Sequence, residues 1–296
     1  MQGQAADSFT FFVISDVHIE PGNTRAISHF QTALQDLHEI APQAGALVIN
    51  GDMTSTGRPQ SYAAFQEVLN SCPHPDATYL TIGNHEFFHG EGNEVAIQRF
   101  LAVTGERAVY YSRKIGGYPF LFLGSESWGP VGSPYKDSAV LTEKQLDWLK
   151  QELQRSVSPD TDHTGPIFLF LHQPLPNTVS GSHLWHPVRQ DKELRALLAP
   201  YPQVILFSGH THYSLQSPTM VVQQRWTMVN SATVYQLWGD DEVEGEIPLE
   251  TDDSQGLVVE VSGSSVIIRA REFLRKQWLS HYVIELESGS LTIEQI

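Results

Sequence analysis

The sequence predicts an α/β fold, which some schemes class as α+β, and three observations support this prediction. Short apolar runs alternate with helical patterns through the first half of the chain. Thr142, followed three residues later by Gln145, has the form of a capping box that starts a further helix. From Tyr213 onward, short alternating runs suit antiparallel strands joined by turns. Helices and sheets are therefore expected to pack in layers.

The first half of the chain is interpreted as β-α-β-α-β. Its apolar runs predict strands and its periodic segments predict helices, with strands at residues 9–15, 46–50 and 78–82 and helices at 24–41 and 60–69. The middle of the chain continues this alternation, with strands at 118–124, 166–171 and 204–208 and the capped helix at 142–153.

The last third of the chain is predicted to be rich in antiparallel strands. Short runs at 221–224, 227–230, 256–261 and 266–271 suggest a second sheet, and the segment from about Gly256 is expected to extend one of the sheets. Between these runs, residues 239–253 carry eight acidic side chains and no basic one. We expect a solvated loop there, because the regular spacing of oxygen ligands in a cation-binding loop is missing.

Length and composition favour one globular domain. The 296 residues are 41% hydrophobic, and no run of eighteen apolar residues would cross a membrane as a helix. Since no linker or internal repeat divides the chain, we expect a single domain over 1–296, with a core at about 9–233 and a β-rich extension at about 234–296.

Charge and cysteine content exclude some roles. The formal net charge of -16 makes nucleic acid an unlikely main partner, because its phosphates require clustered Lys and Arg. Cys72 is the single cysteine, so no internal disulfide can form. Residues 1–8 lack the basic start and apolar middle of a secretory signal, so we expect a cytoplasmic protein with no membrane partner.

Five polar clusters each follow a predicted strand. They are Asp16-Val17-His18, Gly51-Asp52, Gly83-Asn84-His85-Glu86, His172, and Gly209-His210-Thr211-His212. In open α/β sheets, ligands bind beyond the carboxyl ends of the strands, so these clusters can converge on one site. Carboxylates, an amide oxygen and imidazoles without thiolates are typical of a site for divalent transition metals.

The ordered string D-x-H, G-D, G-N-H-E, H, G-H-x-H resembles the signature of the calcineurin-like metallophosphoesterases, in particular the group with the class III cyclic-nucleotide phosphodiesterases. The resemblance covers about Phe9 to Thr233. It implies a four-layer αββα sandwich with a di-metal site at the carboxyl ends of the strands. It also implies a hydrolase that acts on a small phosphate ester by means of a metal-activated hydroxide.

The same resemblance implies a role for each ligand. One metal would be held by Asp16, His18 and His212, and the other by Asn84, His172 and His210, while Asp52 would bridge the two. His85 would stabilise the transition state and protonate the leaving oxygen. Mn, Fe, Zn and Ni all accept such ligands, so two ions of these metals are the expected cofactors.

Two departures from the family patterns are visible. Purple acid phosphatases have Gly-Asp-x-x-Tyr and a glycine at the first histidine ligand, whereas this chain has Ser55 and His18. Many relatives also carry an aspartate soon after the Gly-Asp pair that orients the catalytic histidine. Residues 51–57 read GDMTSTG and contain no second carboxylate, so the partner of His85 is not assigned.

Substrate-binding residues are less clearly marked. Arg58 and His89, which follow two of the motifs, are candidate substrate contacts. Other loop residues could border the site: Asn23, Trp128, His183 and His186. The main hypothesis is a phosphodiesterase or phosphomonoesterase. A nuclease and an inactive binding or scaffold protein on the same fold stay open as alternatives.

Overall fold

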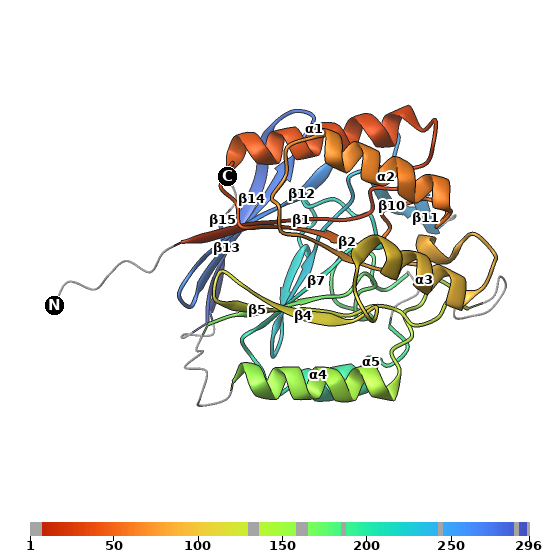
Figure 1. Cartoon of the computed structure of the whole chain (residues 1–296). Coiled ribbons are helices and arrows are strands. Elements are labelled where there is room, and N and C mark those ends of the chain that lie inside the picture. Colours follow the sequence, from red (N-terminus) through yellow and green to blue (C-terminus); the bar gives the residue numbers. More distant parts are fainter. Residues whose placement is uncertain are drawn as a thin grey trace.

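The computed structural model describes residues 8–129, 136–157, 165–184, 188–241, 245–286 and 290–294. Two β-sheets pack face to face, and helices cover the outer face of each sheet, which gives four layers (Figure 1). This arrangement confirms the predicted αββα sandwich. No helix in the described part of the chain is long and apolar enough to cross a bilayer.

The first sheet has seven strands in the order β15-β14-β13-β12-β1-β2-β3. Their bounds are β1 (Phe9–Ile14), β2 (Ala46–Asn50), β3 (Thr78–Thr81), β12 (Gln255–Ser262), β13 (Ser265–Glu272), β14 (Gln277–Glu285) and β15 (Ser290–Glu294). Strands β1, β2 and β3 run parallel, and β12 pairs antiparallel with β1. The segment from Gly256 therefore extends this sheet, as expected.

The second sheet has six strands in the order β4-β5-β6-β7-β9-β8. Their bounds are β4 (Tyr111–Ile115), β5 (Tyr118–Phe122), β6 (Ile167–Phe170), β7 (Val204–Ser208), β8 (Val221–Gln223) and β9 (Thr227–Asn230). Strands β5, β6, β7 and β9 are parallel neighbours. The carboxyl ends of β6 and β7 therefore lie at one edge of this sheet.

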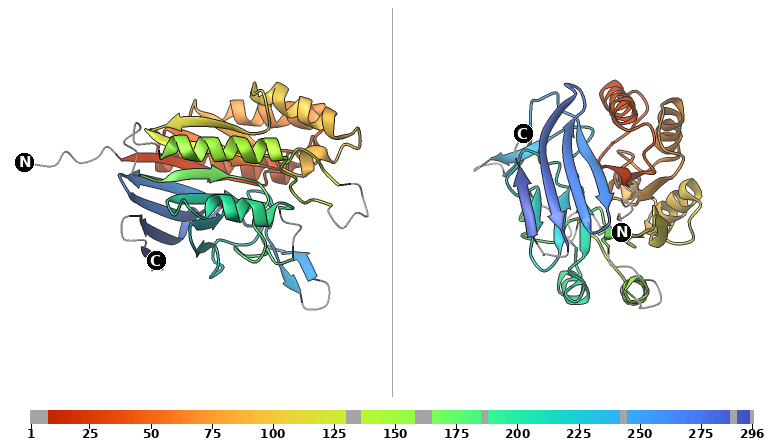
Figure 2. Two further views of the ribbon diagram at one scale, coloured as in Figure 1. Left: turned by 90° about the horizontal axis from the view of Figure 1, so that it is seen from below. Right: turned by 90° about the vertical axis from the view of Figure 1, so that its left-hand side faces the viewer.

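Helices α1 (Thr24–Ile40) and α2 (Pro59–Ser71) cover the first sheet, and α4 (Glu143–Ser156) and α5 (Asp191–Leu198) cover the second (Figures 1 and 2). The described residues also form the short η1 (His85–Phe87) and the helix α3 (Asn93–Thr104). Thr142 caps α4 as predicted, because its side chain accepts a hydrogen bond from the Gln145 backbone N–H at 3.3 Å.

Aromatic side chains dominate the core between the two sheets. Phe11 of β1 meets Phe120 of β5 and Phe168 of β6 edge to face, with ring centroids 4.9 and 4.8 Å apart. All three rings are fully buried, and each such side chain contributes roughly 1.5–3 kcal/mol through burial. Aromatic packing therefore joins β1 and β6, the strands that precede Asp16 and His172.

Three expectations for the second half of the chain need correction. The runs near 221–230 join the sheet of β4 to β7 instead of forming a separate sheet, and β9 is parallel to β7. The acidic segment contains a hairpin of β10 (Trp238–Asp241) and β11 (Gly245–Pro248), which projects from the body of the molecule (Figure 2, left). The bridge between Tyr213 and Trp238 anchors this hairpin, so its acidic composition does not make it a free loop.

Candidate metal centre

The loops after five parallel strands carry the seven predicted metal ligands. Asp16, Asp52 and His172 each lie two residues beyond the end of their strand, which is β1, β2 or β6. Asn84 follows β3, and His210 lies two residues beyond β7. All seven ligand residues are buried, with relative exposures of 8% or less. The structure therefore brings together residues that are as much as 196 positions apart, from Asp16 to His212.

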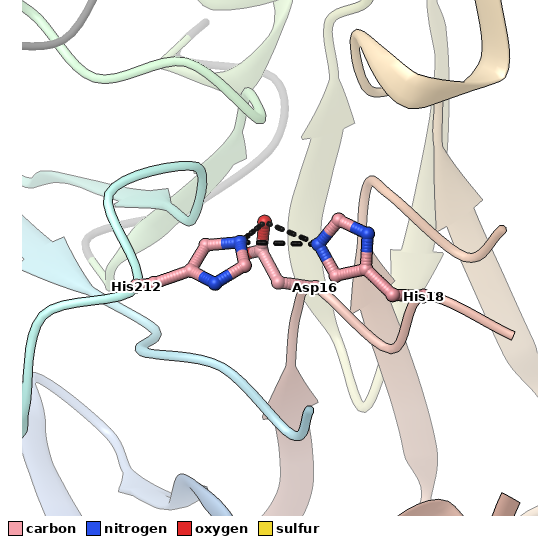
Figure 3. A group of neighbouring side chains, drawn as sticks. All are labelled: Asp16, His18 and His212. Atoms are coloured by element: carbon pink, nitrogen blue, oxygen red, sulfur yellow. Dashed lines mark hydrogen bonds and ion pairs between the residues drawn. The ribbon is translucent and has the colours of Figure 1, made fainter. Parts of the chain in front are cut away.

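The first group of ligands consists of Asp16, His18 and His212 (Figure 3). Asp16 Oδ1 lies 3.0 Å from His212 Nε2 and 3.8 Å from His18 Nε2. The two Nε2 atoms are 3.1 Å apart. Figure 3 shows the Asp16 oxygen facing a ring nitrogen of each histidine, so three potential ligand atoms point at one place.

The second group consists of Asp52, His172 and His210, whose potential ligand atoms lie within 4.8 Å of one another. His172 Nε2 lies 3.2 Å from Asp52 Oδ2 and 3.2 Å from the side-chain oxygen of Asn84. Asp52 Oδ2 is also 3.9 Å from His18 Nε2, which belongs to the first group. Asp52 thus reaches both groups, and so does Asp16, whose Oδ1 is 3.8 Å from His172 Nε2. The family resemblance predicts Asp52 as the bridging carboxylate.

Backbone carbonyls turn the histidine rings toward the centre. The Nδ1 atoms of His172 and His212 lie 2.8 Å from the carbonyl oxygens of Asn50 and Gln236. A neutral ring that donates its Nδ1–H to such a carbonyl keeps the Nε2 lone pair for a metal. The donors are carboxylate and amide oxygens and imidazole nitrogens without a thiolate, a set that suits Mn, Fe, Zn or Ni. The residues present therefore fit a dinuclear metal site.

The backbone at the ligands is unusual. Five of the seven ligand residues have positive φ, between 50° and 70°: Asp16, His18, Asp52, His210 and His212. This left-handed region costs a residue with a side chain about 1–2 kcal/mol. Strained backbone of this kind gathers at functional sites, where the surrounding structure holds it in place. The strain therefore supports a functional centre here, independently of the ligand chemistry.

Burial and neighbouring charges both shift the pKa values of the predicted ligands in the metal-free protein. Burial, followed by the nearby His85, lowers the pKa of His18 to about 4. Burial alone would also lower the pKa of His172, but the carboxylates of Asp52 and Asp16 outweigh it and raise the pKa to about 10. The carboxylates of Asp52 and Asp16 therefore favour the protonated form of His172 in the metal-free protein.

His85 lies beside the two groups and is the most accessible of the site histidines, with a side chain that is 28% exposed. Its backbone N–H donates to Asp52 Oδ1 at 2.9 Å, and its Nδ1 lies 2.9 Å from the carbonyl oxygen of Ser55. The backbone carbonyl of Ser55 thus orients the His85 ring, in a segment that has no second carboxylate to do so. The ring also packs against Phe88, with centroids 4.1 Å apart.

Glu86 is a part of the site to which sequence reasoning assigned no role. Its buried Oε2 accepts the backbone N–H groups of Asp52 and Gly83, at 3.1 and 2.8 Å. Its Oε1 accepts the N–H and the hydroxyl of Thr54, both at 3.1 Å. The side chain therefore ties the loop of Asp52 to the loop of Asn84. Its place in the Gly-Asn-His-Glu motif was the available signal.

The candidate substrate contacts lie at the periphery of the ligand loops. Arg58 is exposed at the start of α2. The side chain of His89 is buried, and its Nδ1 accepts the N–H of Glu91 at 2.9 Å. A substrate contact stays a prediction for both residues. Asn23 caps α1 through its side-chain oxygen, which accepts the Ala26 N–H at 3.2 Å.

Two loop histidines were also candidate neighbours of the site. His183 is exposed, and His186 lies outside the described residues.

Comparisons with known proteins agree with this geometry. A family model described as Calcineurin-like phosphoesterase matches residues 9–214. Over 207 residues the chain is 28% identical to a 3',5'-cyclic-nucleotide phosphodiesterase of Nostoc sp. (strain PCC 7120), which covers 67% of this chain and 70% of that protein. Over 240 residues it is 23% identical to a glycerophosphodiester phosphodiesterase of Enterobacter lignolyticus (strain SCF1), with coverages of 76% and 77%.

Solved structures show the same fold. A dimetal phosphatase from Danio rerio aligns with a TM-score of 0.63 at 14% identity, over 91% of this chain and 97% of that one. A purple acid phosphatase from yellow lupin seeds aligns with a TM-score of 0.65 at 13% identity, over 96% of this chain and 55% of that one. Because the matching family model spans more than half of the sequence and includes all seven predicted ligands, the chain belongs to the calcineurin-like phosphoesterase family and is a phosphoester hydrolase.

Proposed function

We propose that the protein is a metal-dependent phosphodiesterase that hydrolyses a small phosphate ester, with phosphomonoester hydrolysis as the second candidate activity. The observation that carries this proposal is the position of Asp52, whose Oδ2 lies 3.2 Å from His172 Nε2 in one buried group and 3.9 Å from His18 Nε2 in the other. The diesterase is favoured because both curated relatives named above are phosphodiesterases.

In this proposal the chain supplies two half-sites and one shared ligand. Asp16, His18 and His212 would hold one ion, and a second set would hold the other: Asn84, His172 and His210. When bound, two such ions neutralise phosphate oxygens and lower the pKa of a water molecule. The carboxylate of Asp52 would screen the repulsion between the two cations. Mn, Fe, Zn and Ni are the candidate metals.

His85 would supply the proton. A leaving alkoxide must be protonated, and a general acid must reach the leaving oxygen from a ring nitrogen that is not otherwise occupied. The contact between His85 Nδ1 and the Ser55 carbonyl fixes one edge of the ring. Nε2 is then left to hold or release a proton on the side of Asp52, from which it is 3.9 Å away.

The two alternatives are disfavoured for different reasons. A nuclease needs a basic surface for a polyanion, and the net charge of -16 opposes this. A scaffold protein would not need to retain a complete ligand set, and all seven side chains are present and buried. A small soluble ester is therefore the proposed substrate, with no role for nucleic acid or a membrane.

The deciding experiment is a substrate panel on protein loaded with each candidate metal. It compares bis(p-nitrophenyl) phosphate, p-nitrophenyl phosphate, a 3',5'-cyclic nucleotide, a glycerophosphodiester and single-stranded DNA. We expect the highest kcat/KM on a small diester. A preference for the monoester would replace the diesterase with a phosphatase, and preference for DNA would favour the nuclease. No turnover with two bound metals would favour the scaffold.

A further inference from the structure

Asp137 lies next to the second group of ligands without being one of them. Asp137 is 7% exposed, and its backbone lies in the left-handed region with a φ of 65°. Its Oδ1 accepts the indole N–H of Trp128 at 2.9 Å and lies 3.5 Å from the side-chain nitrogen of Asn84. Its backbone carbonyl accepts the side-chain N–H of Gln173, the neighbour of His172, at 3.1 Å.

We propose that Asp137 is a positioning residue that sets which end of the Asn84 amide faces the second metal, an inference that rests on the proposed function. The oxygen and nitrogen ends of an asparagine amide have almost the same shape, but only the oxygen can bind a cation. The nitrogen of Asn84 faces the Asp137 carboxylate, and the oxygen lies 3.2 Å from His172 Nε2. A flipped amide would set its oxygen against a carboxylate oxygen, so Asp137 opposes the unproductive orientation.

The contact with Trp128 holds the Asp137 carboxylate in place. The Trp128 ring packs against Phe88 with centroids 5.3 Å apart, and Phe88 packs against the ring of His85. Oδ1 of Asp137 therefore faces both the side-chain amide of Asn84 and the indole N–H of Trp128, whose ring contacts the aromatic neighbour of His85. The Gln173 contact fixes the backbone of the same loop beside His172. These three contacts place Asp137 where an outer partner of a metal ligand has its effect, on orientation.

The test is a titration of metal-stripped protein with Mn²⁺ by calorimetry, which measures two binding constants without reference to activity. Asp137→Gly removes the carboxylate, and glycine suits the left-handed backbone, so the variant should fold. We expect one of the two sites to weaken by about 10–100-fold, the usual effect of losing an outer partner of a ligand, and the other to change less than about threefold. Asp137→Asn keeps an oxygen acceptor, so it should retain wild-type affinity within about threefold.

Two further variants define the mechanism. Asp147→Ala removes a carboxylate from the exposed face of α4 and should leave both sites unchanged, which controls for net charge. Asn84→Ala should weaken the same single site, and adding Asp137→Gly to it should have an effect below about twofold, because the amide that Asp137 orients is gone. Circular dichroism of each metal-free variant checks that it is folded.

Equal affinity of wild type and Asp137→Gly at both sites would overturn the inference. Equal losses in Asp137→Gly and Asp137→Asn would show that charge matters and orientation does not, and would overturn it too. The inference would also be overturned if the effects of Asp137→Gly and Asn84→Ala on metal affinity were fully additive. If the wild type itself binds no Mn²⁺, Fe²⁺, Zn²⁺ or Ni²⁺, the proposed function fails, which is a separate result.

Discussion

Replacing Glu86 by glutamine should destabilise the metal-free protein by about 3–5 kcal/mol. The carboxylate accepts four hydrogen bonds, two at each oxygen, from Asp52, Thr54 and Gly83. Glutamine replaces one of these acceptors by an NH₂ donor. The better orientation turns the NH₂ toward Thr54, whose hydroxyl can rotate to accept, but the Thr54 N–H then loses its partner.

The magnitude follows from the groups affected. A buried N–H left without a partner costs about 1–3 kcal/mol. The bonds from Asp52 and Gly83 would pass from a charged acceptor to a neutral one, which weakens the two by about 2 kcal/mol together. Urea denaturation of the metal-stripped proteins measures the difference in the free energy of unfolding. Glu67→Gln on the exposed side of α2 is the matched control and should change stability by less than about 0.5 kcal/mol.

The protonation state of Glu86 decides the result. Burial, followed by the charge of Asp52, raises the pKa of Glu86 to about 8, which would leave it neutral at pH 7. Three of the four partners are backbone N–H groups, which can only donate, and a protonated carboxyl would turn the Thr54 hydroxyl into an acceptor and weaken the bond from the Thr54 N–H. The geometry therefore favours the ionised form. A loss below about 1 kcal/mol in Glu86→Gln would refute this reasoning, because a protonated glutamic acid and glutamine would then be nearly equivalent.

Three other predictions concern the metal site. Wild-type protein should bind about two metal ions, and Asp52→Ala should lose at least one of them together with most activity, because the anion shared by the two cations is gone. Elemental analysis and turnover assays measure this, and two retained metals in the variant would contradict it. His85→Ala should keep both metals but slow the hydrolysis of alkyl esters by roughly 10²–10⁴-fold. Hydrolysis of nitrophenyl esters should slow much less, because nitrophenolate leaves without a proton. Equal slowing of both substrates would contradict the general-acid role. Metal affinity should rise with pH from 6 to 9, because the pKa of His172 is raised to about 10 and its proton must leave before metal binds. Calorimetry in buffers of different ionisation enthalpy detects the proton that His172 releases on metal binding. A metal affinity that does not change with pH would contradict this prediction.

The pattern of strands and ligands could be predicted from sequence because it depends on local signals. The buried runs before Asp16, Asp52 and His172 are apolar and short, and each ends in a polar cluster. Parallel strands share a carboxyl edge, so these local patterns together imply a site. The chemistry of the side chains then indicates metal ions. The roles of the individual ligands stay predictions until metal binding is measured.

Features that depend on contacts distant in sequence could not be predicted in the same way. Asp137 lies 53 residues from Asn84 and follows no predicted strand. The partner of His85 is the carbonyl of Ser55, and a backbone atom leaves no residue type to recognise. The parallel pairing of β9 with β7 and the hairpin at Trp238 likewise depend on where the chain returns, and composition does not record this.

The left-handed backbone at five ligand residues sets metal binding against the stability of the metal-free chain. At such positions glycine fits the backbone better than aspartate or histidine. Selection for thermal stability alone would therefore favour glycine at His18 or His212, and would remove the predicted ligands one at a time. A library of variants sorted for stability without metal should drift toward glycine there, whereas the same library sorted with metal present should keep these side chains. The predicted ligands are thus also positions at which the backbone of the metal-free protein carries conformational strain.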